Sequence, residues 1–109
     1  MIKEILSAAG IPHEPGRFPD PPPGDYAVYF DDVDTLEGPD PVPGATQLLT
    51  HNAMVELYKP DHGGVSEANL EAELDARCIA WTKQAAYWLQ NVQRYQVVYE
   101  FTYKEKRRT

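Results

Sequence analysis

A run of acidic residues is the first place in the sequence to look for chemistry, because closely spaced carboxylates bind hard cations such as Ca²⁺. Five carboxylates occur between residues 31 and 40. A calcium-binding loop that began at Asp32 would need a glycine at its sixth position and an acid at its twelfth, where this chain has Glu37 and Pro43. The run is therefore predicted to hold no metal and to form either an acidic docking surface or a plainly solvated loop.

The other residue types that support catalysis or cofactor binding also lack a recognisable arrangement. His13, His51 and His62 show no metal-type spacing between any two of them. Gly63 and Gly64 precede a helical stretch, as in phosphate-binding loops, but the lysine and the hydroxyl residue of a Walker loop are missing. We therefore expect no enzymatic activity, no catalytic residues, no cofactor and no metal.

The end of the chain is basic, although the protein as a whole is acidic. Its 17 acids and 10 bases give a net charge of −7, which argues against a general nucleic-acid binder. Residues 1–80 carry −11 and residues 81–109 carry +4. Complementary charges favour head-to-tail contact between copies or docking on a charged partner, and a solvated surface is the competing explanation. Four of the bases fall within the last six residues: Lys104, Lys106, Arg107 and Arg108.

Length and composition predict one compact domain that spans residues 1–109. The chain is 42% hydrophobic and 25% charged, close to the average of globular domains. Cys78 is the only cysteine, so no internal disulfide can form, and we expect it to be a small core residue in a reducing compartment. The sequence shows neither a signal peptide nor an apolar run long enough to cross a membrane, so we expect a soluble intracellular protein.

Periodicity divides the domain into two helices and four strands joined by proline-rich connections. The order α-β-β-α-β-β predicts a two-layer α+β domain with a mainly antiparallel four-stranded sheet and both helices on one face. The helices are expected from Ile2 to about Gly10 and from Ser66, as N-cap, to about Cys78. The strands are expected at residues 26–30, 47–58, 81–89 and 95–104. The connections include a proline-rich arm over residues 11–24 and an acidic loop over residues 31–44.

Four segments of the chain carry a likeness to a known family. They are Tyr26 to Asp32 (YAVYFDD), Glu56 to Tyr58, Leu70 to Arg77 and Tyr95 to Arg107 (YQVVYEFTYKEKR). These segments resemble the small tail-completion or tail-terminator proteins of long-tailed bacteriophages. The resemblance covers residues 1–108, departs from the family mainly at the proline-rich stretches 19–24 and 39–44, and depends on strand patterns rather than on catalytic residues.

The resemblance implies a virion structural protein that catalyses no reaction. Such a subunit assembles into a homo-hexameric ring at the head-proximal end of the tail tube, where it stops tube growth and joins the tail to the head. The implied partners are the tail tube protein and the head-completion or connector proteins. DNA passes through the lumen of the ring without specific binding, and no membrane is involved. The implied location is the tail or neck of the virion, after assembly in the host cytoplasm.

Two charged groups are the candidate contact surfaces of this subunit, because a ring needs one patch that meets a different patch on the next copy. The acidic group is Asp31, Asp32 and Asp34, and the basic group is Lys104, Lys106, Arg107 and Arg108. Three other functions remain open. They are a head-completion or adaptor protein of the neck, a monomeric inhibitory module whose acidic face mimics nucleic acid, and a small enzyme with a polar cluster in a concave pocket.

Overall fold

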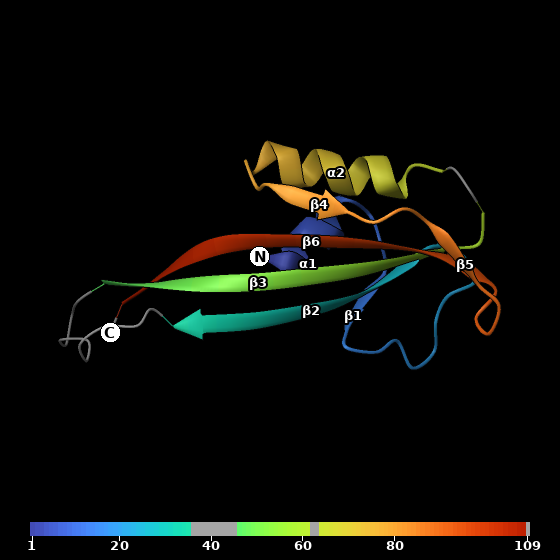
Figure 1. The fold of residues 1–109 in the computed structure, drawn as a ribbon, viewed down its shortest axis with the longest axis horizontal. Helices are drawn as coiled ribbons and strands as arrows, with labels where there is room; N and C mark the ends of the chain where they lie inside the picture. Colours follow the sequence, from blue (N-terminus) through green and yellow to red (C-terminus); the bar gives the residue numbers. More distant parts are fainter. Residues whose placement is uncertain (36–45, 62–63, 109) are drawn as a thin grey trace.

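The computed structural model describes residues 1–35, 46–61 and 64–108, which form two helices and a six-stranded mixed sheet (Figure 1). The hydrogen-bonded strand order is β1-β2-β3-β6-β4, and β5 also pairs with β6. The helices are α1 (Ile2–Ala8) and α2 (Ser66–Ala76). The strands are β1 (His13–Pro15), β2 (Tyr26–Thr35), β3 (Thr46–Lys59), β4 (Trp81–Lys83), β5 (Tyr87–Leu89) and β6 (Arg94–Arg108).

The α+β class is confirmed, whereas the sheet has six strands instead of four, and the element order is α-β-β-β-α-β-β-β instead of α-β-β-α-β-β. Part of the proline-rich arm forms β1, which pairs in parallel with residues 27–29 of β2. Proline lacks a backbone donor, and Pro15 is accommodated because β1 is an edge strand. The stretch expected as one strand over residues 81–89 is two short strands, β4 and β5, with the Gln84 amide still bonded to the Val98 carbonyl between them.

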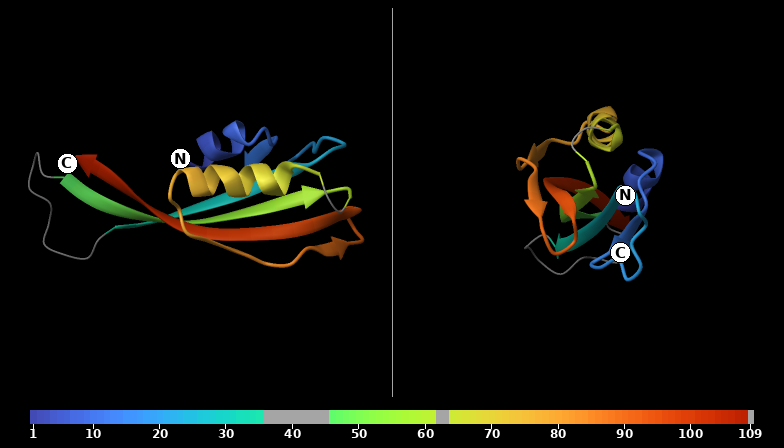
Figure 2. Two further views of the ribbon diagram at one scale, coloured as in Figure 1. Left: turned by 90° about the horizontal axis from the view of Figure 1, so that it is seen from above. Right: turned by 90° about the vertical axis from the view of Figure 1, so that its right-hand side faces the viewer.

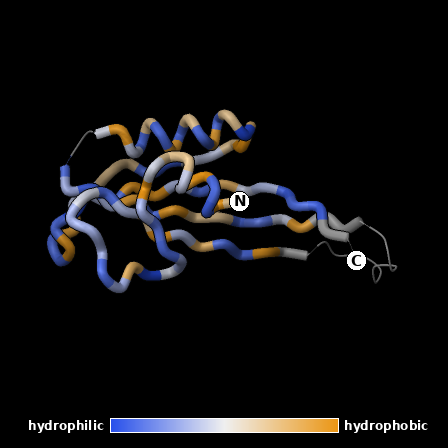
Figure 3. The backbone as a smooth tube through the Cα atoms, turned by 180° about the vertical axis from the view of Figure 1, so that it is seen from behind, coloured by the Kyte–Doolittle hydropathy of each residue, from blue (hydrophilic) through white to orange (hydrophobic). Residues whose placement is uncertain are grey.

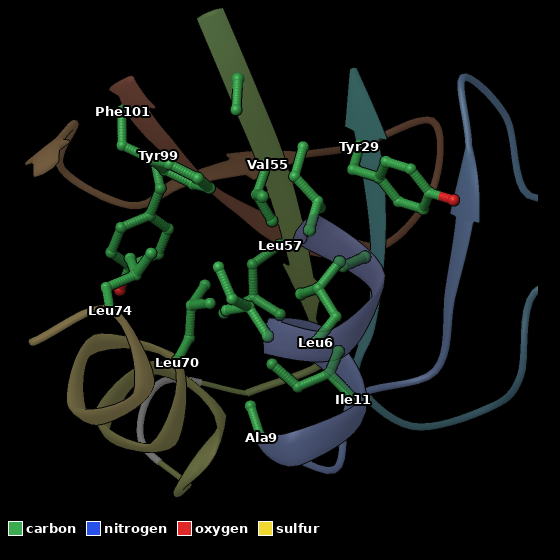
Figure 4. Packing of buried hydrophobic residues seen from close by; sticks show 14 of the residues in the cluster. Leu6, Ala9, Ile11, Tyr29, Val55, Leu57, Leu70, Leu74, Tyr99 and Phe101 are labelled. Carbon is green, nitrogen blue, oxygen red and sulfur yellow. The ribbon is translucent and has the colours of Figure 1, made fainter. Parts of the chain in front are cut away.

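Both helices cover the same face of the sheet, and the core lies between the two layers (Figure 2). Hydrophilic and hydrophobic residues alternate along the strands (Figure 3). Because successive side chains of a strand point to opposite faces, one set of them faces the helices. On that face Leu57 of β3 is fully buried between Leu6 of α1 and Leu70 of α2 (Figure 4). Tyr99 of β6 is also fully buried, beside Leu74 of α2. The two helices also meet each other, because the Asn69 side-chain amide donates to the Ala9 carbonyl at 3.4 Å.

The first helix is short and depends on this packing. Ile2, Ile5 and Leu6 are buried, as their three- and four-residue spacing predicts. Gly10 has a φ of +74°, the left-handed conformation expected of a residue that ends a helix. A helix of seven residues does not form alone in water, so the buried side chains hold α1 in place.

The start and the end of α2 each correct one sequence-based expectation. Val65, rather than Ser66, is the N-cap residue, and no side chain caps the first turn. Cys78 is exposed rather than buried, and its φ is +57°. The Ile79 amide donates to the Leu74 carbonyl and the Cys78 amide donates to the Asp75 carbonyl, each at 3.0 Å. These bonds form a Schellman-type helix end in which a left-handed residue is required.

Replacement of Cys78 by glycine is expected to raise the free energy of unfolding by about 0.5–1 kcal/mol. A residue with a Cβ atom costs about 1–2 kcal/mol in the left-handed region, and the extra backbone entropy of glycine in the unfolded chain cancels part of the gain. Urea unfolding of Cys78→Gly and Cys78→Ala measures the difference, because alanine keeps the Cβ atom and removes only the thiol. A glycine variant less stable than the alanine variant would contradict this account of the helix end.

Strands β2, β3 and β6 are much longer than their neighbours and extend beyond the helices. We call this extension the ribbon: residues 32–35 of β2, 46–52 of β3 and 102–108 of β6. It makes the molecule elongated, with extents of 51 × 28 × 21 Å (Figure 1). The acidic loop expected from residue 31 therefore begins later, because β2 continues to Thr35 in antiparallel register with β3. Residues 36–44 of that loop lie outside the described residues.

Candidate interaction surface

The ribbon has an outer strand edge on each side. On one side, β1 covers residues 27–29 of β2, and the last bond across that edge runs from the Gly16 amide to the Tyr29 carbonyl. On the other side, β4 pairs with residues 99–101 of β6. Beyond these points no strand in the described part of the chain pairs with the outer edge of β2 or of β6. Such edges present backbone donors and acceptors to any strand that approaches them.

The two charged groups expected from the sequence lie on these two edge strands. The register pairs Asp34 with Thr50 and Thr50 with Lys104, so β3 alone separates the acidic strand from the basic one. Two strand spacings separate the backbones of these two strands by about 10 Å. The charge asymmetry between the two ends of the sequence therefore becomes an asymmetry between the two sides of one ribbon.

The individual charged residues occupy different positions. Asp32 and Lys106 are exposed, and the Lys104 ammonium donates to the Thr50 hydroxyl at 2.6 Å. Asp34 belongs to β2 by its backbone pairing. The backbones of Arg107 and Arg108 likewise belong to β6, paired with the start of β3, and the side chains of these two arginines lie outside what the structure describes.

Asp31 is used within the subunit, in a cluster at the base of the ribbon that the sequence did not indicate. His51 is 7% exposed and lies between two carboxylates: its Nδ1 is 2.9 Å from Asp31 Oδ1 and its Nε2 is 2.5 Å from Glu105 Oε2. The ring of His51 stacks on Tyr103 with centroids 4.4 Å apart, and the Tyr103 hydroxyl donates to Asp31 Oδ2 at 2.9 Å. One carboxylate comes from β2 and the other from β6, so His51 of β3 connects all three ribbon strands.

The geometry of this cluster favours a charged imidazole. An ionised carboxylate only accepts hydrogen bonds, so both ring nitrogens of His51 must donate. Burial lowers the pKa of His51, but the hydrogen bonds and charges of Asp31 and Glu105 outweigh it, and the net pKa is raised above its ordinary value. Burial and the adjacent Asp31 carboxylate raise the pKa of Tyr103, which keeps its hydroxyl protonated as the donor.

A second charged cluster fastens α2 to the sheet. Glu71 of α2 accepts from the Tyr99 hydroxyl at 2.6 Å and from the Lys83 ammonium at 2.9 Å. Glu67, one turn earlier, accepts from Lys59 at 3.0 Å, and the Lys59 side chain is 2% exposed. Burial raises the pKa of Glu71, but its bonds to Tyr99 and Lys83 lower it by more, so its net pKa is below the ordinary value. This cluster is a structural connection between β3, β4, β6 and α2.

Replacement of Tyr99 by phenylalanine is expected to cost about 1–2 kcal/mol of unfolding free energy at neutral pH, because it removes a hydrogen bond to a charged group. The folded pKa of Glu71 is lowered, so its contribution is present above the unfolded value and is lost as pH falls through the folded value. The difference between the wild type and Tyr99→Phe should therefore shrink at pH 3. Urea unfolding at pH 7 and pH 3 measures it, with Tyr29→Phe as the buried-tyrosine control. An equal difference at both pH values would contradict the role of Glu71.

The face of the sheet opposite the helices is only partly covered. Phe18 packs edge-on against Tyr26, with ring centroids 5.4 Å apart, so the proline-rich arm covers one end of this face. Further along, Phe30 is 37% exposed at a shallow hollow of about 640 Å³. The hollow is lined by apolar residues and by carboxylates, among them Phe30, Met54, Asp32 and Glu100. Within the described residues no group of three or more His, Cys, Asp or Glu side chains could hold a metal ion.

No known protein family matches this chain, and neither does any curated protein or any solved structure. Among the described residues, no helix is long and apolar enough to span a membrane. The site must therefore be interpreted from its own geometry, whose main feature is a ribbon with an acidic edge and a basic edge.

Proposed function

We propose that the protein is a virion structural subunit, a tail terminator or tail-completion protein that forms a ring at the head-proximal end of a phage tail tube. The observation that carries the proposal is the pair of outer ribbon edges with opposite charge. Residues 32–35 of β2 contain two acids and no base, and residues 102–108 of β6 contain four bases and one acid. The function is one of assembly, with no reaction catalysed and no cofactor required.

The charges select which edges can meet. Two β2 edges repel each other, and so do two β6 edges, whereas β2 of one copy attracts β6 of the next. This is a heterologous contact, in which one patch meets a different patch on the neighbour, and such contacts produce a ring when the rotation closes. Charged edge strands normally prevent sheet-to-sheet aggregation, and here the same charges permit one pairing only.

Strand direction is compatible with a ring. Both β2 and β6 run antiparallel to β3, so they run parallel to each other, towards the free end of the ribbon. A copy placed beside β6 through its own β2 would keep that direction, so every ribbon in the ring would point the same way. The ring would then present the ribbons on one side and the helix-covered bodies on the other, as a junction between two different structures requires.

The resemblance supplies the rest of the proposal. It assigns six copies to the ring, the tail tube protein to one side and head-completion or connector proteins to the other. DNA crosses the lumen without specific binding, in keeping with a net charge of −7 that does not attract phosphates. The subunit assembles in the host cytoplasm and remains in the tail or neck of the virion.

Two experiments test this function. Light scattering coupled to size exclusion, at several protein and salt concentrations, measures the mass of the assembly. Electron microscopy of purified tail tubes shows whether the protein caps them. The expected result is a mass of six subunits, or a monomer that forms a six-fold cap when tubes are added. A protein that stays monomeric at high concentration and leaves the tubes uncapped would overturn the proposal in favour of a monomeric acidic inhibitory module. Binding to the portal side of the head instead of the tube would indicate a head-completion or adaptor protein.

A further inference from the structure

The cluster around His51 has a property that neither the fold nor the proposed ring requires. A single buried imidazole connects two carboxylates on different strands, at the place where the ribbon leaves the body. Histidine is the side chain whose ordinary titration falls between pH 5 and 8. The side-chain bonds that link β2, β3 and β6 at this place thus depend on one exchangeable proton.

Loss of that proton changes attraction into repulsion. With a charged imidazole, the cluster of His51, Asp31 and Glu105 carries a net charge of −1 and both ring nitrogens donate. With a neutral imidazole, the net charge is −2, and one ring nitrogen turns a lone pair towards a carboxylate oxygen 2.5 or 2.9 Å away. A buried acceptor that faces another acceptor loses its hydrogen bond and gains a Coulomb penalty.

We propose that His51 is a proton-operated latch. As an imidazolium, it binds side chains of β2 and β6 and holds these strands against β3 at the base of the ribbon. When it loses its proton, the base of the ribbon opens. Opening here means local exchange of the strands with solvent, not unfolding of the core. The core residues Val55, Leu57 and Tyr99 lie on the body side of this cluster, beneath the helices.

The other groups that face this histidine supply no second positive charge. Tyr103 of β6 donates to Asp31, which leaves the other oxygen of that carboxylate for the histidine. Glu4 of α1 adds negative charge near Tyr103. The side chains of Leu49 and Ala53, which lie next to His51 on its own face of β3, are apolar and buried. No base among the described residues contacts the imidazole, so the proton on His51 is the positive charge of the cluster.

The pH range of the latch follows from the direction of the pKa shift. The folded pKa of His51 is raised, so its stabilising effect is fully present below the unfolded value of about 6.5 and is lost as pH rises through the folded value. Between these two values, the equilibrium for opening the ribbon should increase about tenfold per pH unit. From pH 6.5 down to about pH 5.5, above the ordinary titration range of carboxyl groups, the opening should not depend on pH.

Two measurements on the intact chain test the latch. Nuclear magnetic resonance titration of the His51 ring should give a midpoint above 6.5. Amide hydrogen exchange at residues 49–53 and 101–105, corrected for the intrinsic pH dependence of exchange, should show opening that rises above neutral pH. Residues 55–57 and 97–99 under the helices should keep their protection over the same range.

The variant Glu105→Gln distinguishes a latch from a merely structural histidine. Glutamine can still accept a hydrogen bond but has no charge, so the His51 midpoint and the pH at which opening levels off should both move to lower pH, and the total increase in opening should become smaller. Glu100→Gln is the matched control, because Glu100 is exposed on the opposite face of the same strand and should change none of these. The Glu105 side chain is 53% exposed, so this variant can fold even where His51→Gln does not. A His51 midpoint at or below 6.5, or a rise in opening whose size and upper limit Glu105→Gln does not change, would overturn the latch and leave the proposed ring untouched.

Discussion

Replacement of both Lys104 and Lys106 by glutamate is expected to abolish self-assembly of the subunit, with a loss of at least about 100-fold in association constant. The change turns the basic edge of the ribbon acidic, so that it meets the acidic β2 edge of the next copy as a like charge, which costs several kcal/mol. Because exposed charges contribute little to folding, thermal unfolding should stay close to that of the wild type. Analytical ultracentrifugation of wild type and variant measures the loss of the oligomer.

Two further variants make this prediction specific to the edges. The double change Lys3→Glu and Arg17→Glu alters the net charge by the same amount at exposed positions of α1 and of the arm, and should leave assembly unchanged. Adding Asp32→Lys and Asp34→Lys to the defective variant reverses both edges and should restore assembly. Two results would exclude pairing between these edges. One is assembly that persists when the basic edge alone is reversed, and the other is failure of the quadruple variant to assemble.

Replacement of Leu57 by alanine is expected to lower the free energy of unfolding by about 3 kcal/mol, the typical cost of a large-to-small change in a packed core. Leu57 is fully buried, and both helices pack around it. Neither short α1 nor α2 can rearrange to fill the space without losing contacts elsewhere in the cluster. Urea unfolding followed by far-ultraviolet circular dichroism measures the loss.

Met54→Ala is the control for Leu57→Ala, because Met54 lies on the opposite face of the same strand, at the uncovered hollow. It should cost less than about 1 kcal/mol, as changes outside a packed core do. Equal losses at the two positions would mean that both faces of β3 are packed. That result would contradict the arrangement of both helices on a single face.

Much of the fold follows from local patterns in the sequence. Buried apolar residues recur every three or four positions in α1, and in β6 the helix-facing residues 97, 99, 101 and 103 recur every second position. Both periods can be read without knowing any contact. The bounds of the strands are harder to predict from local patterns. Asp31, Asp32 and Asp34 have low strand propensity, and β2 includes them only because β3 offers backbone partners opposite each one. Pro15 likewise belongs to a strand only because it lies at an edge.

The sequence by itself determined the α+β class, the apolar faces and the unequal distribution of acids and bases, because these depend on residue type and on spacing along the chain. Only the tertiary structure decided which charges meet. His51 is 20 positions from Asp31 and 54 from Glu105, and the strand register that brings them together is fixed by packing over the whole sheet. The same register places the acidic and basic groups on two sides of one ribbon, since strands far apart in sequence share β3 as their neighbour.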